Sequence, residues 1–264
     1  MAEPRDYTTA YIVKFAAAIC VVCSVVVATS AVILKPKQVA NKIIDRQKKV
    51  LVVANLMEEK EGLTDEEIRE RYTKSIKTKI INLSTGEYAK DVDGSTFDQR
   101  KASKKPETSK AAPANLAKVM RIPNHGMVYH VVKNNQVEML IIPIEGYGLW
   151  STLYGFLALS GDTKTIRGIT FYEHLETPGL GGEVDNPRWK ALWDGRLAFD
   201  ENWDIKIQVI KGVAGSASED PFHVDGLSGA SITSRGVTNM LSFWLGSKGY
   251  GPYLKKYRTT SGAS

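Results

Sequence analysis

An uninterrupted apolar segment lies near the N-terminus of the 264-residue chain. Residues 15–34 carry no charge and consist mostly of Ala, Val and Ile. At about 1.5 Å per residue, a helix of this length spans the roughly 30 Å hydrocarbon core of a bilayer. A cleaved signal peptide is the alternative, but its apolar region is shorter, about 7–15 residues. We therefore predict an uncleaved transmembrane helix at 15–34, after an N-terminal tail of residues 1–14.

The next part, residues 35–115, combines helical and extended patterns. Apolar residues at helical spacing predict a helix over 38–60. A capping-box sequence, Thr-Asp-Glu-Glu, opens a second predicted helix over 64–76. Residues 84–115 are rich in Lys, Ser, Thr, Asp, Pro and Ala, and this composition predicts an extended surface segment or linker.

After residue 116 the pattern changes to short strands and helices. Two β-branched runs around Asn134-Asn135, at 128–132 and 137–144, predict a β-hairpin. The apolar, aromatic-rich stretch 149–159 predicts a buried helix, and 165–172 alternates as a strand does.

Further along, Asn186-Pro187 has the form of an N-cap with proline at the first helical position. A strand is predicted at 205–210 and an amphipathic helix from Ser231 to Leu245. Strands and helices intermix without βαβ repeats, so we predict an α+β fold. We predict one domain of this fold at 116–256 and a C-terminal tail at 257–264.

Composition and charge limit the classes of function that the chain could have. The net charge of +6 is spread along the chain without a zinc-finger or basic-helix pattern, so nucleic-acid binding is not expected. Cys20 and Cys23 both lie in the apolar segment; a metal cluster is conceivable there, but packing in a helix is the simpler interpretation. Four scattered histidines have no ligand spacing, so we predict no metal site: His125, His130, His174 and His223.

The segment 225–234, Asp-Gly-Leu-Ser-Gly-Ala-Ser-Ile-Thr-Ser, immediately precedes and opens the last amphipathic helix. A helix N-terminus offers unpaired N–H groups that favour phosphate, and Gly226 and Gly229 allow close approach to the backbone. A plain capped helix, with Ser228 or Ser231 as N-cap, fits the same residues. The residues alone leave both interpretations open.

Two other segments are ambiguous in the same way. The glycine-dense stretch 176–183, Glu-Thr-Pro-Gly-Leu-Gly-Gly-Glu, matches neither a P-loop nor a Rossmann fingerprint. It is either a loop close to a planar ligand or a structural turn. The aromatic stretch 146–154 could flank such a ligand or belong to the core.

The order and combination of these segments resemble the C subunits of Na⁺-translocating NADH:quinone oxidoreductases, in the FMN-binding domain family. The resemblance covers nearly the whole chain. It includes the apolar segment and the motifs at 97–101, 148–151, 176–183, 225–230, 243–246 and 249–252.

The resemblance implies a mixed α+β FMN-binding domain at 116–256 with covalently bound FMN. The family attaches FMN through phosphate to the last residue of a Ser/Thr-Gly-Ala-Thr motif, which corresponds here to Ser231. The usual Thr is Ser in this chain; Thr233 is the second-choice acceptor. Asp225 corresponds to the residue recognised by the flavin transferase. The other implied cofactor-binding residues are Leu149, Trp150, Glu176, Thr177, Leu180, Ser228, Gly229 and Ala230.

The function implied is electron transfer within a complex that couples NADH oxidation and quinone reduction to Na⁺ export. Expected partners are the other subunits, the FMN transferase and membrane lipid, and no complete activity is expected from this chain alone. The family places the domain on the periplasmic side of the bacterial inner membrane. The basic residues at 35–49 favour the cytoplasm instead, but that rule is weak before a long domain. Two alternatives remain: the homologous subunit of an Rnf-type ferredoxin:NAD⁺ oxidoreductase, and a non-redox membrane-anchored binding or assembly protein.

Overall fold

The computed structural model describes residues 8–94, 96–134 and 136–261. The outer parts of the two predicted tails, 1–7 and 262–264, lie outside these ranges, as does Asn135 of the predicted hairpin turn. The chain divides into two units, 1–45 and 46–264.

The first unit is helical. Helix α1 (Thr9–Val53) contains the predicted apolar segment, and its side chains from Thr9 to Ile43 are exposed. Its most apolar 18 residues have a mean hydropathy of 2.7, and within the described ranges it is the one helix long and apolar enough to cross a membrane. The helix predicted at 38–60 is continuous with it but ends at Val53, because Asn55 adopts a positive φ of 55°.

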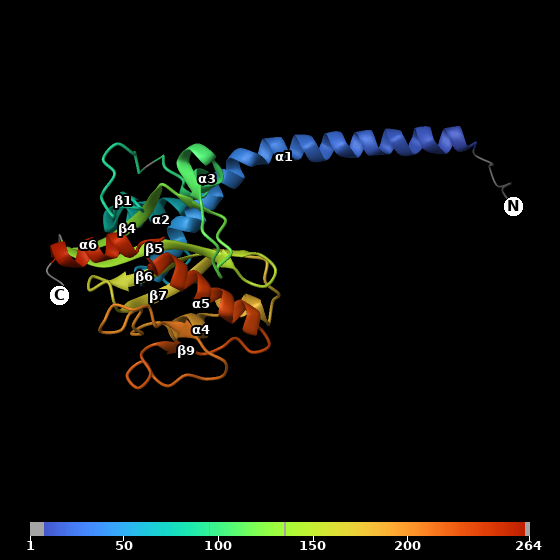
Figure 1. The fold of residues 1–264 in the computed structure, drawn as a ribbon. Helices are drawn as coiled ribbons and strands as arrows, with labels where there is room; N and C mark the ends of the chain where they lie inside the picture. The colour runs from blue at the N-terminus through green and yellow to red at the C-terminus, as the bar shows by residue number, and fades with distance from the viewer. Residues whose placement is uncertain (1–7, 95, 135, 262–264) are drawn as a thin grey trace. The chain divides into compact units, whose positions relative to one another are not determined.

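The second unit is built on a five-stranded antiparallel sheet (Figure 1). Its order is β1-β4-β5-β6-β7. The strands are β1 (Ile76–Asn82), β4 (His125–Lys133), β5 (Gln136–Tyr147), β6 (Thr152–Ser160) and β7 (Ile166–Glu173). The predicted hairpin and the strand predicted at 165–172 are confirmed as β4–β5 and β7. Strand β1 precedes residue 116, so the sheet draws on both sides of the predicted domain boundary, which stays a prediction.

The helix predicted at 149–159 is wrong, because this stretch is a hairpin end followed by strand β6. A short apolar run does not distinguish a buried strand from a buried helix by periodicity, and β6 is buried on both faces. Gly155 fits the strand for a physical reason: a Cβ there would lie 2.3 Å from the carbonyl oxygen of Thr170 on β7.

One face of the sheet is covered by helix α5 (Ser231–Leu245), which lies along it in Figure 1. The predicted helix boundaries are confirmed, and the predicted apolar face is fully buried: Val237, Met240, Leu241 and Trp244. The Trp244 indole N–H donates to the carbonyl oxygen of Glu145 on β5 at 2.7 Å. This helix therefore has a fixed position on the sheet, and so has its N-terminus.

The remaining helices are short. Helix α2 (Asp65–Ser75) begins with the predicted capping box. Helix α4 (Pro187–Ala191) begins, as predicted, after Asn186, whose side chain accepts the Arg188 N–H. The last element that the structure describes is α6 (Gly251–Ser261).

The stretch 84–115, predicted as a surface segment or linker, is ordered against the core. It contains α3 (Gln99–Lys104), the 3₁₀ helix η1 (Pro106–Thr108) and β2 (Ser109–Ala111), which pairs with β3 (Arg121–Pro123). The Gln99 side-chain oxygen accepts the Met127 N–H at 2.7 Å and the Tyr250 hydroxyl at 3.0 Å. Polar side chains hold this segment in place, and for that reason apolar periodicity did not reveal it.

The strand predicted at 205–210 is shorter than expected. Only β8 (Gln208–Val209) forms, and it pairs in parallel with β9 (His223–Val224). Strand β9 leads directly into the segment 225–231. Gly226 is required there, because a Cβ would lie 2.3 Å from the Ile210 carbonyl oxygen.

Candidate functional site

The candidate site begins at the N-terminus of α5. Ala230 is the N-cap residue, and in the described part of the chain no side chain caps this helix. The alternative interpretation, a plain helix capped by Ser228 or Ser231, is therefore wrong. Ser231 is the first helical residue, and Ser228, Gly229 and Ser231 are exposed. The first N–H groups of a helix need partners from elsewhere, so this end is suited to an anion.

The tight turn before the helix is held from inside. Gly229 has a positive φ of 68°, a conformation that costs glycine little. The buried Ser234 hydroxyl donates to the Ala230 carbonyl oxygen at 3.1 Å and accepts the Leu227 N–H at 3.0 Å. Ser234 thus stabilises the turn, while the Ser231 hydroxyl faces solvent and forms no hydrogen bond with the residues that the structure describes.

Thr233, two residues further on, has the opposite environment. Its side chain is fully buried, and its hydroxyl donates to Glu176 Oε2 at 2.6 Å. The two hydroxyls of the motif therefore differ in access, although both lie in the first turn of α5.

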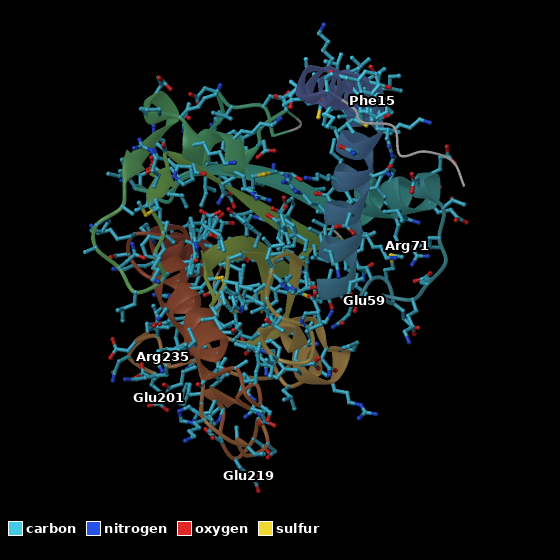
Figure 2. All side chains as sticks on the ribbon, turned by 90° about the vertical axis from the view of Figure 1, so that its right-hand side faces the viewer. Phe15, Glu59, Arg71, Glu201, Glu219 and Arg235 are labelled. Atoms are coloured by element: carbon cyan, nitrogen blue, oxygen red, sulfur yellow. The ribbon has the colours of Figure 1, made fainter. Side chains whose placement is uncertain are left out.

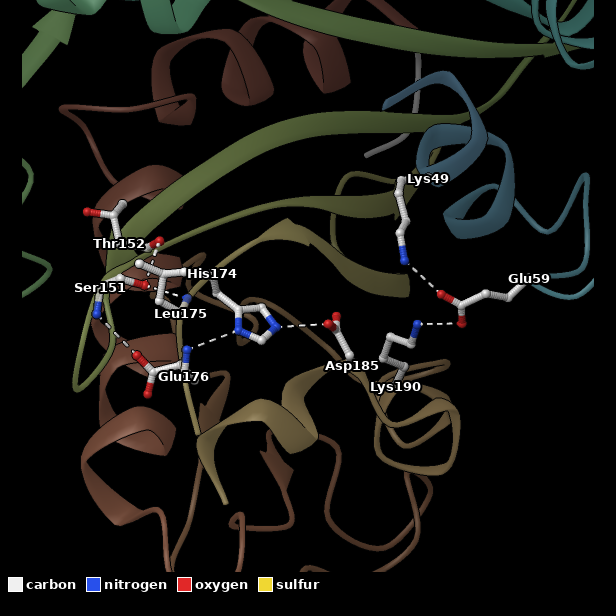
Figure 3. Close-up of polar contacts among 9 residues, drawn as sticks. All are labelled: Lys49, Glu59, Ser151, Thr152, His174, Leu175, Glu176, Asp185 and Lys190. Carbon is white, nitrogen blue, oxygen red and sulfur yellow. Dashed lines mark hydrogen bonds and ion pairs between the residues drawn. The ribbon is translucent and has the colours of Figure 1, made fainter. Parts of the chain in front are cut away.

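The buried Glu176 carboxylate connects this turn to the end of the β5–β6 hairpin. Oε1 accepts the backbone N–H groups of Leu149 at 3.0 Å, Trp150 at 3.0 Å and Ser151 at 3.3 Å (Figure 3 shows the last of these). Burial disfavours the charge, but hydrogen bonds from Thr233 and from these three N–H groups outweigh it and lower the pKa of Glu176. The carboxylate is therefore ionised at neutral pH.

Neighbouring hydrogen bonds hold the segment before Glu176. The Leu175 N–H donates to Ser151 Oγ at 2.8 Å, and the Glu176 N–H donates to His174 Nδ1 at 3.2 Å. The other ring nitrogen of His174 lies 2.8 Å from Asp185 Oδ2 (Figure 3). Because Nδ1 accepts, Nε2 carries the hydrogen that faces Asp185.

Apolar side chains surround this buried network but remain exposed. Leu149 is 40% exposed, Trp150 64% and Leu180 44%. Sequence reasoning selected these three, but it missed Leu175 and Ile232, which are also exposed beside the same segments. The sequence did not indicate that these two residues are exposed at the site, because apolar residues next to helices and strands usually belong to the core.

The glycine-dense segment forms a compact turn. The Thr177 carbonyl oxygen accepts the N–H groups of Leu180 at 3.1 Å and Gly182 at 2.9 Å, and Gly179 has a φ of 76°. The 3₁₀ helix η2 (Gly181–Asp185) follows. The turn brings Leu180 over the α5 motif, because a Cβ on Gly229 would lie 2.9 Å from Leu180 Cδ2.

Asp225 lies at the start of the motif and is half-buried. Its carboxylate accepts the Ala214 N–H at 2.9 Å, and its carbonyl oxygen accepts the Trp189 indole N–H at 2.9 Å. Asp225 thus connects the motif to the loop before β9 and to α4.

The charge near Ser231 suits an anion. Arg235 is exposed and follows Ser231 by one helical turn, so both lie on one side of α5 (Figure 2 labels Arg235 on this helix). In the ranges that the structure covers, no three His, Cys, Asp or Glu side chains are grouped as metal ligands.

Comparison with known proteins gives a consistent picture. Residues 148–246 match the FMN-binding domain family. The chain is 44% identical over 261 residues to the C subunit of the Na(+)-translocating NADH-quinone reductase of Pseudomonas aeruginosa, covering 98% of both chains. It is 45% identical to the protein of the same name from Vibrio parahaemolyticus, covering 90% of each. The crystal structure of Shewanella oneidensis NqrC superimposes with a TM-score of 0.77 at 35% identity, covering 83% of this chain and 99% of that one.

Proposed function

The chain belongs to the family of Na⁺-translocating NADH-quinone reductase C subunits, and on this premise we propose that it carries FMN covalently on Ser231. The Ser231 oxygen would take the FMN phosphoryl group from a flavin dinucleotide donor of the transferase: the donor's phosphoanhydride bond breaks, its nucleoside monophosphate leaves, and the hydroxyl proton is released. The observation that carries this proposal is the exposed Ser231 hydroxyl at an uncapped helix N-terminus. Free N–H groups, the helix dipole and Arg235 all favour phosphate at this position.

The difference in burial between the two hydroxyls supports Ser231 as the acceptor. Thr233 was the second choice, but its buried hydroxyl is already bound to Glu176. An enzyme that modifies the folded chain reaches Ser231 and not Thr233. The serine in place of the family's usual threonine keeps the required oxygen.

The flavin ring needs apolar and small surfaces next to the phosphate. We propose that Leu149, Trp150, Thr177 and Leu180 contact it, with the exposed Ser228 and Gly229 and the buried Ala230 beside the attachment point. Leu149, Trp150 and Leu180 are exposed, so their side chains are accessible to a flavin ring. FMN transfers one or two electrons when bound; the residues of this chain hold it and limit the access of water.

In the complex, we propose that this chain passes electrons between the cofactors of neighbouring subunits during quinone reduction and Na⁺ export. Helix α1 anchors it in the bacterial inner membrane, with the FMN-binding domain in the periplasm. Asp225 takes part in recognition by the flavin transferase. NADH and quinone bind to other subunits, so this chain alone has no complete activity.

Intact-mass analysis of the full-length protein, co-produced with the transferase, tests this function. We expect one FMN on the wild type, none on Ser231→Ala and one on Ser231→Thr and Thr233→Val. Peptide mapping should place the group on residue 231. An unmodified wild type would contradict the covalent attachment and favour the non-redox binding protein. FMN mapped to Thr233 would contradict the acceptor assignment alone.

A further inference from the structure

Three segments of the proposed FMN site meet at one buried carboxylate. Glu176 accepts N–H groups from the Leu149–Ser151 turn, and it accepts the Thr233 hydroxyl from the first turn of α5. Glu176 itself belongs to the turn that carries Leu180. All three segments therefore depend on the same side chain for their relative positions.

Two glycines form the space that this carboxylate occupies. A Cβ on Gly148 would lie 2.6 Å from Glu176 Oε1. A Cβ on Gly181 would lie 2.6 Å from both Glu176 Oε2 and Thr233 Oγ1. These distances are shorter than real Cβ contacts, so the backbone closes around the carboxylate on two sides and leaves no space for a ligand atom there.

We propose that Glu176 is a positioning residue, which fixes the Leu149–Ser151 turn and its exposed Trp150 relative to the FMN on Ser231. This inference rests on the proposed function and deepens it. The resemblance implies that Glu176 is a cofactor-binding residue. Because its carboxylate is buried and its oxygens already accept hydrogen bonds from the protein, we infer that it acts on FMN only through the residues that it holds in place.

The donor set explains why a carboxylate is needed. An ionised carboxylate offers only acceptors, and here it receives three N–H groups and one hydroxyl. A glutamine of equal size would direct its own N–H groups at one side of this donor set. Hydrogen bonds to a charged acceptor are about twice as strong as those between neutral groups, so the turn depends on the charge.

Hydrogen exchange of the full-length protein without FMN tests the contacts directly. Thr233→Val removes one donor to Glu176 at nearly constant volume. Because the loss of a charge-assisted hydrogen bond loosens the turn, we expect the Leu149, Trp150 and Ser151 amides to exchange about tenfold faster. Glu176→Gln should have a larger effect on the same amides. Thr233→Ser retains the hydroxyl and should exchange as the wild type does.

Thr238→Val is the matched control. Thr238 lies on the same helix, and its hydroxyl accepts the Val209 N–H at 2.9 Å, outside the proposed site. Its substitution removes two neutral hydrogen bonds from α5, the one from the Val209 N–H and a longer one to the Ser234 carbonyl oxygen, without touching Glu176. We expect unchanged exchange at 149–151 in this variant.

The second measurement uses the FMN-loaded proteins and records flavin fluorescence lifetime and midpoint potential. We expect both to change in Glu176→Gln and in Thr233→Val, and neither to change in Thr233→Ser or Thr238→Val. A change of midpoint potential in Glu176→Gln without any change in Thr233→Val would overturn the proposal that Glu176 positions the turn. The carboxylate charge would then act on the flavin potential directly.

The remaining outcomes are also decisive. Unchanged exchange in Thr233→Val and Glu176→Gln would overturn the proposed contacts, and faster exchange with unchanged flavin signals would overturn their part in positioning the turn beside the FMN. A wild type that takes up no FMN would refute the proposed function and with it the positioning of FMN; exchange would then report only on the structural contacts of Glu176.

Discussion

Gly181→Ala provides the sharpest test of the close packing around Glu176. The new Cβ would lie 2.6 Å from both Glu176 Oε2 and Thr233 Oγ1, whereas ordinary van der Waals contact begins at 3.4 Å. Both neighbouring atoms belong to side chains held by hydrogen bonds. The substitution must therefore move both of them by close to an ångström or shift the backbone.

The free-energy cost has two parts. Overpacking a filled site costs about 1–3 kcal/mol, and separating Thr233 from the carboxylate costs about 1.5–3 kcal/mol more. Together they predict a loss of about 2.5–6 kcal/mol in the free energy of unfolding. For a unit of about 150–250 residues, 1 kcal/mol lowers Tm by about 2–4 °C, so the Tm should fall by at least about 5 °C.

Thermal unfolding of the full-length protein in detergent, followed by tryptophan fluorescence, measures this change. Two other glycines serve as controls. Gly179→Ala meets no atom within 4 Å but places alanine at a φ of 76°, which costs about 1–2 kcal/mol. Gly62→Ala has neither problem and should match the wild type. Equal Tm values for Gly181→Ala and Gly62→Ala would refute the close packing around Glu176.

Two further predictions concern charged side chains outside the proposed site, Glu145 on β5 and Arg100 on α3. Burial raises the pKa of Glu145 to about 6, although Arg100 and Lys104 oppose it. Because the folded-state pKa exceeds the ordinary 4.5, ionisation costs the folded state stability as pH rises between these values, up to about 2 kcal/mol. Urea titrations at several pH values should show this loss in the wild type and not in Glu145→Gln; parallel curves would contradict it. Arg100 donates twice to Glu173, at 2.8 and 2.9 Å, and stacks 3.5 Å from the Tyr154 ring centroid. Arg100→Lys keeps the charge but loses this geometry, so urea unfolding should show a loss of about 1 kcal/mol, and an unchanged midpoint would count against it.

Much of the fold followed from local patterns. The helix at 231–245 was predicted because four apolar residues recur on one face, and α4 because Asn186-Pro187 is a strong start signal. The stretch 149–159 could not be predicted in this way. Strand β6 is buried on both faces, so its apolar run lacks alternation, and its neighbours β5 and β7 decide its conformation.

The candidate site was predicted less completely than the fold. Composition indicated a phosphate-friendly helix start, and resemblance selected Ser231 within it. Neither indicated that Thr233 is buried, since that depends on a contact with Glu176, 57 residues earlier in the chain. The role of Gly181 could not be predicted either. From the sequence, a glycine that allows an unusual backbone conformation cannot be distinguished from one that leaves space for a neighbouring side chain.

The Thr233–Glu176 contact also has a consequence for the order of folding. Strands β4 to β7 follow one another as a meander of neighbouring antiparallel pairs, so they require only short loops to close. The contact between Glu176 and Thr233 closes a loop of 57 residues and carries a larger entropic cost. We therefore expect the hydroxyl of Thr233 to become buried only when α5 docks on the sheet. If FMN is attached to residue 231 alone, we expect that the transferase acts on the chain after α5 has docked.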